Sequence, residues 1–97
     1  MTVEEVAEYN EEALICDGFD DAIIGVAQRI NLCVAAYDVD KIIDILKADM
    51  TLDDEELKLS VEEQDSIRYE MALEYFNFNI IGSWVGENTP VFIYTSY

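Results

Sequence analysis

The sequence predicts an α+β fold: a mainly antiparallel four-stranded sheet, two main helices on one face of that sheet, and a short N-terminal helix. Short apolar runs rich in β-branched and aromatic residues indicate the strands. Two later segments carry apolar residues at the i, i+3, i+4, i+7 spacing of amphipathic helices. Three of the strand-like runs follow one another closely, which favours hairpins and antiparallel pairing. At 97 residues, we expect a single acidic domain over 1–97.

The first element is a two-turn helix that ends near residues 9–10. Thr2 is followed three residues later by Glu5, which is the pattern of a capping box, and small apolar residues then recur at helical spacing. The apolar run 13–16 comes next and stops at Asp17-Gly18. We expect this run to be a strand that ends in a turn.

A β-hairpin follows. Residues 21–28 and 32–37 are two short apolar runs, and the segment 29–31 between them suits a tight connection. Gly25 lies inside the first run and marks a bulge or a close approach of backbone.

The hydrophobic period then changes to that of a helix, which Asp38 or Asp40 caps and which ends near Asp49. Its apolar positions are Val39, Ile42, Ile43 and Leu46. The acidic stretch 53–56 after it is either a helical turn or an acidic loop, and 51–63 is the only candidate insertion in the chain.

The most regular helix begins at Ser60, which forms a second capping-box pattern with Glu63, and it ends at Gly82. Pro90 then precedes a last strand over 91–94, at a position that proline tolerates. We expect the apolar stripe of this helix to face the core. The stripe consists of Ile67, Met71, Tyr75 and Phe78, widened by Ala72, Phe76 and Ile80.

The charge is strongly negative. The chain has 22 Asp and Glu, 5 Lys and Arg and no His, which gives −17 at pH 7, while 52% of its residues are hydrophobic. Disordered acidic chains lack that much apolar material, so we expect a folded core. Such a surface repels nucleic acid and anionic membranes and attracts basic protein surfaces. The alternative is that the acidity only keeps the protein in solution.

Catalytic residue patterns are missing. Without His, a Ser nucleophile has no base, and no glycine-rich phosphate loop occurs. Cys16 stands beside Asp17, whose charge disfavours a thiolate. We therefore expect no enzyme and no cofactor.

Metal binding is also not expected. Asp17, Asp20 and Asp21 surround Gly18, but their spacing departs from that of a calcium loop. Cys16 and Cys33 are too few for a zinc site, and we expect both to be buried free thiols.

Nothing in the sequence indicates a membrane or secreted protein. No apolar stretch approaches the ~20 residues of a membrane span, and the first residues lack the pattern of a signal peptide. A cytoplasmic location is therefore expected. The aromatic residues are assigned to packing, since base stacking needs basic neighbours. Trp84 is either part of that core or an anchor at a protein interface.

The acidic residues concentrate in two segments, one near the N-terminus and one between the two main helices. Exposed carboxylates along helices occupy positions comparable to DNA phosphates, so a basic nucleic-acid channel would bind them. The candidate partner-binding residues are Glu4, Glu5, Glu8, Asp53, Asp54, Glu55, Glu56, Glu62, Glu63 and Asp65.

Two stretches carry a resemblance: residues 17–26, DGFDDAIIGV, and residues 74–93, EYFNFNIIGSWVGENTPVFI. Together they resemble a family of small uncharacterised proteins of tailed bacteriophages and some bacteria. The apolar segment 32–46 fits the same pattern, whereas that family usually has a short turn where this chain has the acidic segment 51–63. The resemblance implies a phage setting and the cytoplasm of a bacterial host cell. It carries over no functional residues.

Two functions follow as expectations. The first is a non-enzymatic protein-binding module, by class-level analogy a phage inhibitor of the DNA-mimic, anti-CRISPR or anti-restriction type. Its partner would be a basic surface of a nucleic-acid-binding host protein, with no direct nucleic acid or membrane contact, and the chain would be a monomer or homodimer. The second is a structural or ligand-binding accessory protein, with a pocket formed by the turn 17–21 and the loop 82–90.

Overall fold

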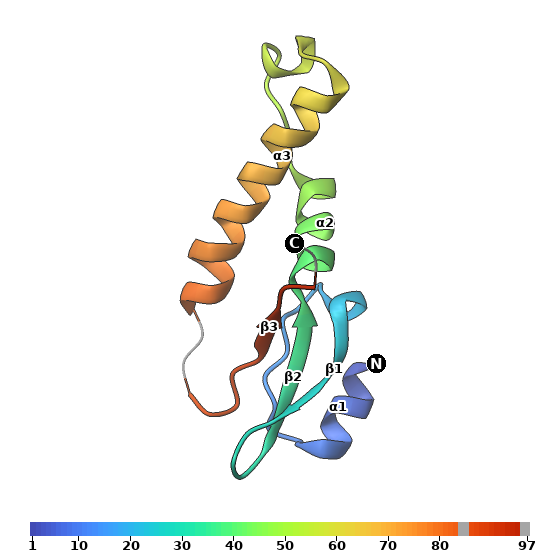
Figure 1. Cartoon of the computed structure of the whole chain (residues 1–97), viewed down its shortest axis with the longest axis vertical. Coiled ribbons are helices and arrows are strands. Elements are labelled where there is room, and N and C mark those ends of the chain that lie inside the picture. The colour runs from blue at the N-terminus through green and yellow to red at the C-terminus, as the bar shows by residue number, and fades with distance from the viewer. Residues whose placement is uncertain (84–85, 96–97) are drawn as a thin grey trace. The chain divides into compact units, whose positions relative to one another are not determined.

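Figure 1 shows the computed structural model of the chain, which describes residues 1–83 and 86–95. These residues divide into two units. Unit 1 comprises Met1–Ile42 and the described residues of the C-terminal segment, and unit 2 comprises Ile43–Ser83. The boundary falls inside helix α2 (Val39–Asp49). That the whole chain is one domain, with both main helices on one face of the sheet, stays a prediction.

Helix α1 (Val3–Tyr9) opens unit 1 and has the expected capping box. The Glu5 N–H donates to Thr2 Oγ1 at 3.2 Å, and the Thr2 N–H donates to Glu5 Oε1 at 3.0 Å. Two backbone donors of the helix start are thereby satisfied. Val6 is buried where α1 packs against the first two strands of the sheet.

The predicted hairpin is confirmed as strands β1 (Ile23–Gln28) and β2 (Cys33–Asp38), which pair antiparallel (Figure 1). The Arg29 N–H closes the turn on the Leu32 carbonyl at 2.7 Å. The register shifts between Ile23 and Gly25, so the bulge expected at Gly25 is present. β1 starts two residues later than expected because the 3₁₀ turn η1 (Asp20–Ala22) precedes it.

The prediction of a mainly antiparallel four-stranded sheet was wrong. The sheet has three strands in the order β1-β2-β3, and β3 (Val91–Ile93) runs parallel to β2. Parallel neighbours need a long crossover, usually a helical one. The helical segments between β2 and β3 supply it, so the last strand joins no hairpin. The Tyr37 ring stacks on Phe92 across this pair, with centroids 5.9 Å apart.

The first of the four predicted strands, at 13–16, does not form. The Ala13 N–H bonds to the Asn10 carbonyl and the Leu14 N–H to the Asn88 carbonyl, each at 3.1 Å. The Cys16 N–H bonds to the hydroxyl of Tyr37 at 2.8 Å. Because a turn, a loop and a side chain satisfy these donors, the run needs no strand partner. The turn expected after it is present, with Gly18 at φ +89°.

Helix α2 follows β2 directly, and Asp38 is its cap. Asp38 Oδ1 accepts the Asp40 N–H at 3.0 Å and also the Thr95 hydroxyl at 3.0 Å. The four apolar positions predicted for this helix are all buried, as expected: Val39, Ile42, Ile43 and Leu46.

Unit 2 continues with the 3₁₀ turn η2 (Glu56–Lys58), helix α3 (Val61–Tyr75), the π-helical turn η3 (Phe76–Ile80) and the 3₁₀ turn η4 (Ile81–Ser83). Ser60 caps α3 as predicted by accepting the Glu63 N–H at 3.2 Å. The second half of the box differs, since the Glu63 carboxylate accepts the Ser60 hydroxyl. The helical run passes Gly82 by one residue.

The predicted core stripe of α3 was wrong at Tyr75 and Phe78 and right at the three residues that widen it. Phe78 is 75% exposed and Tyr75 46% exposed, whereas Ala72, Phe76 and Ile80 are buried. Two apolar rows run side by side on this helix, and periodicity does not tell which of them is buried. The π-helical turn adds to the difference, because the Ile81 N–H reaches back five residues to the Phe76 carbonyl and so changes the direction of the later side chains. Trp84, whose role was left open, lies outside the described residues.

Candidate functional site

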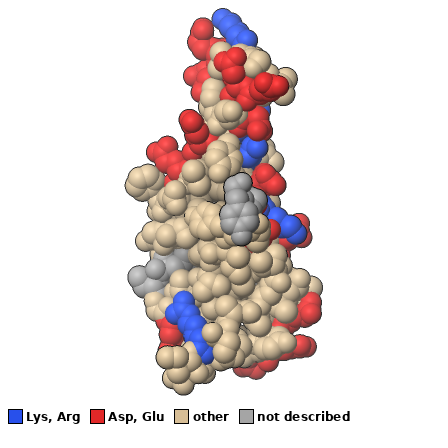
Figure 2. Space-filling view, viewed as in Figure 1, with Lys and Arg blue, Asp and Glu red and all other residues tan. Residues whose placement is uncertain are grey.

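The acidic surface of unit 2 surrounds η2 and the start of α3. Figure 2 shows Asp and Glu side chains gathered over this part of the unit. Residues 43–83 hold eleven Asp and Glu against three Lys and Arg, a net charge of −8 out of −17 for the chain. Of the seven predicted partner-binding residues here, all but Glu56 are exposed.

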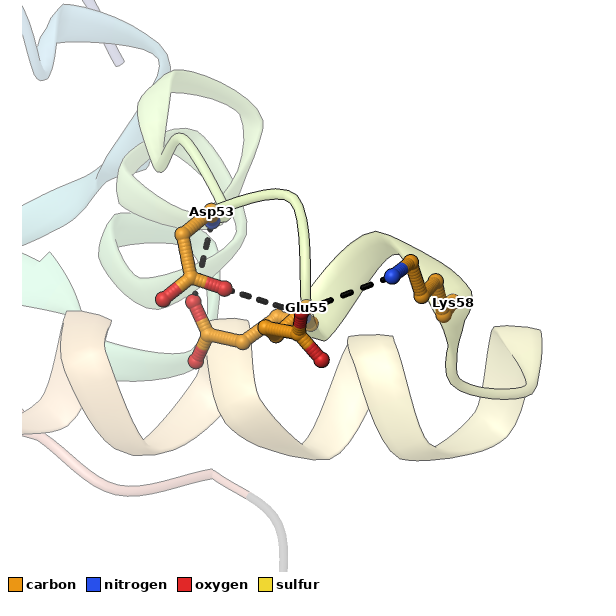
Figure 3. Close-up of polar contacts among 4 residues, drawn as sticks. Asp53, Glu55 and Lys58 are labelled. Carbon is orange, nitrogen blue, oxygen red and sulfur yellow. Dashed lines mark hydrogen bonds and ion pairs between the residues drawn. The ribbon is translucent and has the colours of Figure 1, made fainter.

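Two of these carboxylates hold the segment in shape. The Glu56 N–H donates to Asp53 Oδ1 at 2.8 Å, and the Asp53 N–H donates to Glu56 Oε1 at 3.0 Å (Figure 3). This reciprocal pair has the hydrogen-bond pattern of a capping box and lies just before η2, whose own N-cap residue, Glu55, makes no side-chain cap bond. Of the segment 53–56, for which a helical turn or a loop was expected, only Glu56 belongs to the helical turn η2, and residues 54–55 form a turn before it.

Two cations lie against the acidic surface of unit 2. Lys47 Nζ is 2.7 Å from Asp65 Oδ1 and links α2 to α3, with the Lys47 side chain 21% exposed. Lys58 Nζ is 3.4 Å from Glu55 Oε1 (Figure 3). Both partners of that second pair are largely exposed, so it contributes little to stability.

Gln64 fastens the acidic segment to α3. Its Nε2 donates to the carbonyls of Leu57 at 3.1 Å and Leu59 at 2.9 Å. These two hydrogen bonds therefore connect the loop between η2 and α3 to the first turn of the helix.

On α1, the predicted residues have different roles. Glu5 belongs to the capping box, and the backbone hydrogen bond from Thr2 lowers the pKa of its carboxyl below the ordinary value. Glu4 and Glu8 are exposed and one helical turn apart. That these residues of α1 bind a partner stays a prediction.

The predicted set thus splits into two groups. Within residues 1–83 and 86–95, no hydrogen bond or ion pair involves the carboxylates of Glu4, Glu8, Asp54 and Glu62. The other six carboxylates bind a neighbouring group of the chain: Glu5, Asp53, Glu55, Glu56, Glu63 and Asp65. The engaged carboxylates also belong to the acidic surfaces of the chain. The four unengaged ones are ready to pair with an external cation.

Cys16 and Tyr37 are buried together and are poor nucleophiles. Burial, opposed by a hydrogen bond from Tyr37 and reinforced by the charge of Asp17, raises the pKa of the Cys16 thiol to about 11. Burial likewise raises the pKa of Tyr37 to about 12. Cys33 is a free thiol like Cys16, but it is only half-buried and donates to Gln28 Oε1 at 3.1 Å, so the expectation that both are buried holds for Cys16 alone.

A feature that the sequence did not indicate is an apolar hollow of about 390 Å³ in unit 2, beside the C-terminal part of α3 and η3. It is lined by Met50, Met71, Glu74, Tyr75, Phe78 and Asn79. The sequence predicted that Met71, Tyr75 and Phe78 belong to the core. The hollow becomes apparent only when the structure shows that these side chains are not fully buried.

A second hollow, of about 500 Å³, lies in unit 1 at the β1–β2 turn. The residues of 28–32 and Glu87 line it. The pocket expected between the turn 17–21 and the loop 82–90 is therefore only partly matched: Glu87 takes part, but no residue of 17–21 belongs to the described lining.

Within the described ranges, no helix is long and apolar enough to cross a membrane, and no three His, Cys, Asp or Glu side chains are placed to hold a metal ion. Comparisons with known proteins return no matching family model, no matching curated protein and no matching solved structure.

Proposed function

We propose that this chain is a non-enzymatic acidic binding module that occupies a basic protein surface, of the kind that otherwise holds a nucleic-acid backbone. The observation that carries the proposal is the carboxylate array over η2 and the start of α3, of which Asp54 and Glu62 are exposed and not engaged within the described chain. Capping, the Gln64 bonds and the Lys47–Asp65 pair hold the backbone beneath them, so little backbone ordering entropy is lost on binding.

A phage-encoded inhibitor acting in the cytoplasm of a bacterial host is the setting we propose. It rests on the resemblance described for residues 17–26 and 74–93 and on the physical fit between dense negative charge and a basic channel. The accessory-protein alternative predicts instead that changing these acids alters solubility and no binding event.

Capture of binding proteins from bacterial extract at about 50 mM and about 500 mM salt tests the proposal, because phosphate-mimicking contacts are screened by salt. The captured protein is identified, purified and offered duplex DNA in competition with this chain. We expect capture to fall strongly at high salt and DNA to displace the chain.

A charge-reversal variant makes the test specific to the site. Asp54→Lys with Glu62→Lys should weaken binding of the purified partner at least tenfold. The matched control, Glu11→Lys with Glu12→Lys, changes the net charge equally at exposed acids outside the predicted set. Equal binding by both variants, or capture that is insensitive to salt, would overturn the proposal.

A further inference from the structure

The apolar hollow of unit 2 leaves large hydrophobic side chains exposed. Phe78 and Tyr75 line it and are exposed, and Met50 and Met71 line it and are half-buried. Apolar surface left in water forgoes about 25 cal/mol per Å² of stabilisation. Contiguous apolar surface rimmed by polar groups is typical of protein–protein contact sites.

Negative charge borders this hollow along α3. Glu74 lines it, and Glu70 and Glu63 precede Glu74 by four and eleven residues, which places all three on one side of the helix. All three are exposed. Of the three basic residues of unit 2, Lys47 and Lys58 lie against carboxylates and Arg68 is half-buried. The groove is thus an apolar row beside an acidic row.

We propose that this face of α3 is the docking site for a basic amphipathic helix of the partner protein. An apolar anchor of that helix enters the hollow between Met50, Met71, Tyr75 and Phe78, while its Lys and Arg side chains face the glutamate row. The inference rests on the proposed function. It adds that the partner binds through a helix and that an apolar residue of this helix inserts into the hollow. Amphipathic helices bind apolar grooves in this way, and methionine side chains adapt to the inserted residue.

The dimensions and the charge favour this occupant over a second copy of the chain. From Glu63 to Phe78 the helix rises about 1.5 Å per residue, roughly 22 Å in all, which matches a partner helix of about four turns. A second copy would bring another net charge of −17 against the same glutamates. Like charges placed opposite each other at an interface are destabilising.

The full-length chain, ¹³C-methyl-labelled at methionine, allows a direct test. Met50 and Met71 line the hollow, and Met1 belongs to unit 1 and serves as an internal reference. The probe is a synthetic amphipathic helix of about four turns made of Lys and Leu with one Trp. Two control peptides carry Glu in place of Lys, or the same composition in an order without an apolar face. We expect only the first peptide to shift the Met50 and Met71 signals, with Met1 unchanged.

Two tyrosines of equal exposure on α3 provide the matched variants. Tyr75 and Tyr69 are each 46% exposed, but only Tyr75 lines the hollow. Tyr75→Ala should weaken binding of the Lys/Leu peptide at least fivefold, and Phe78→Ser should do the same, whereas Tyr69→Ala should stay within twofold of the unmodified chain. Because all three side chains are exposed, we expect the variants to fold, which circular dichroism checks.

Several results would overturn the inference. They are equal shifts with the non-amphipathic peptide, equal binding by Tyr75→Ala and Tyr69→Ala, or shifts of Met50 and Met71 on raising the protein concentration alone, which would identify a second copy as the occupant. The proposed function is tested separately. If Asp54→Lys with Glu62→Lys abolishes binding of the captured partner while Tyr75→Ala leaves it intact, the proposed function stands and the helix-docking inference fails.

Discussion

The backbone N–H of Cys16 donates to the hydroxyl oxygen of Tyr37 over 2.8 Å, between two residues that are both buried. This bond joins the irregular segment 13–16, which was expected to be a strand, to β2. The hydroxyl of Tyr37 therefore replaces a strand partner for this part of the chain. The same ring stacks on Phe92 of β3, so this one side chain of β2 contacts two other segments of unit 1.

Removing the Tyr37 hydroxyl should destabilise the protein. Tyr37→Phe leaves the buried Cys16 N–H without its acceptor, which costs about 1–3 kcal/mol. Urea unfolding followed by circular dichroism measures the loss. Tyr9→Phe, at an exposed tyrosine of the same unit, is the control and should change little. A Tyr37→Phe variant as stable as the control would show that another group satisfies the Cys16 N–H.

The two thiols should differ in reactivity. Cys33 is half-buried, while Cys16 is buried and its pKa is raised to about 11, so little thiolate is accessible there at neutral pH. With a disulfide reagent such as DTNB, we expect one thiol to react promptly and the second only on unfolding. Cys33→Ser should remove the prompt phase and Cys16→Ser the slow one. Prompt reaction of both thiols in the folded chain would contradict the burial of Cys16.

Stability should fall in alkali through two overlapping ionisations, those of Cys16 and Tyr37. The folded pKa of Cys16 is about 11 against an ordinary 9.0, so the thiol's contribution is fully present below pH 9 and is lost as pH rises toward 11. That loss is on the order of 2 kcal/mol. Tyr37 acts in the same direction between its ordinary 10.0 and about 12.

The difference between the unmodified chain and Cys16→Ala isolates the thiol from the general charge repulsion of the protein. In urea unfolding over this range, the variant should begin to lose stability about one pH unit later. Parallel stability curves for the two proteins above pH 9 would refute the effect.

The N-terminal cap of α3 should contribute measurably to the free energy of unfolding. Ser60→Ala removes the acceptor of the Glu63 N–H and should cost about 1 kcal/mol. Ser66→Ala, at an exposed position inside the same helix, should be neutral or slightly stabilising because alanine is the better helix former. Thermal melts of both variants measure the difference. A Ser60→Ala melt that coincides with that of Ser66→Ala would show that the cap is not needed.

The Lys47–Asp65 pair should stabilise unit 2 without being part of the partner site. A double-mutant cycle with Lys47→Met and Asp65→Asn should show a coupling of about 0.2–1 kcal/mol, smaller at high salt. Asp65→Asn alone should weaken partner binding less than Glu62→Gln, because Asp65 already faces a cation. The reverse order would assign Asp65 to the interface.

The sequence by itself determined several features whose signals are local, although the local signal for a strand at 13–16 was wrong. The capping residues Thr2 and Ser60, the hairpin at 29–31, the bulge at Gly25 and the four buried positions of α2 follow from spacing and cap chemistry within a few residues. The acidic candidate residues were also found by counting. Composition alone does not show that Asp53 and Glu56 cap a turn while Asp54 and Glu62 are unengaged, since that depends on the backbone between them.

Only the tertiary structure decided the remaining features, each of which depends on contacts between segments far apart in the chain. The parallel β2–β3 pair joins strands separated by the whole helical crossover, and the bonds of 13–16 reach Tyr37 and Asn88. On α3 two apolar rows compete for burial, and the packing of the folded chain together with the π-helical turn leaves Tyr75 and Phe78 outside. The hollow therefore had no local signal, because periodicity reports that a helix is amphipathic and not what covers its apolar face.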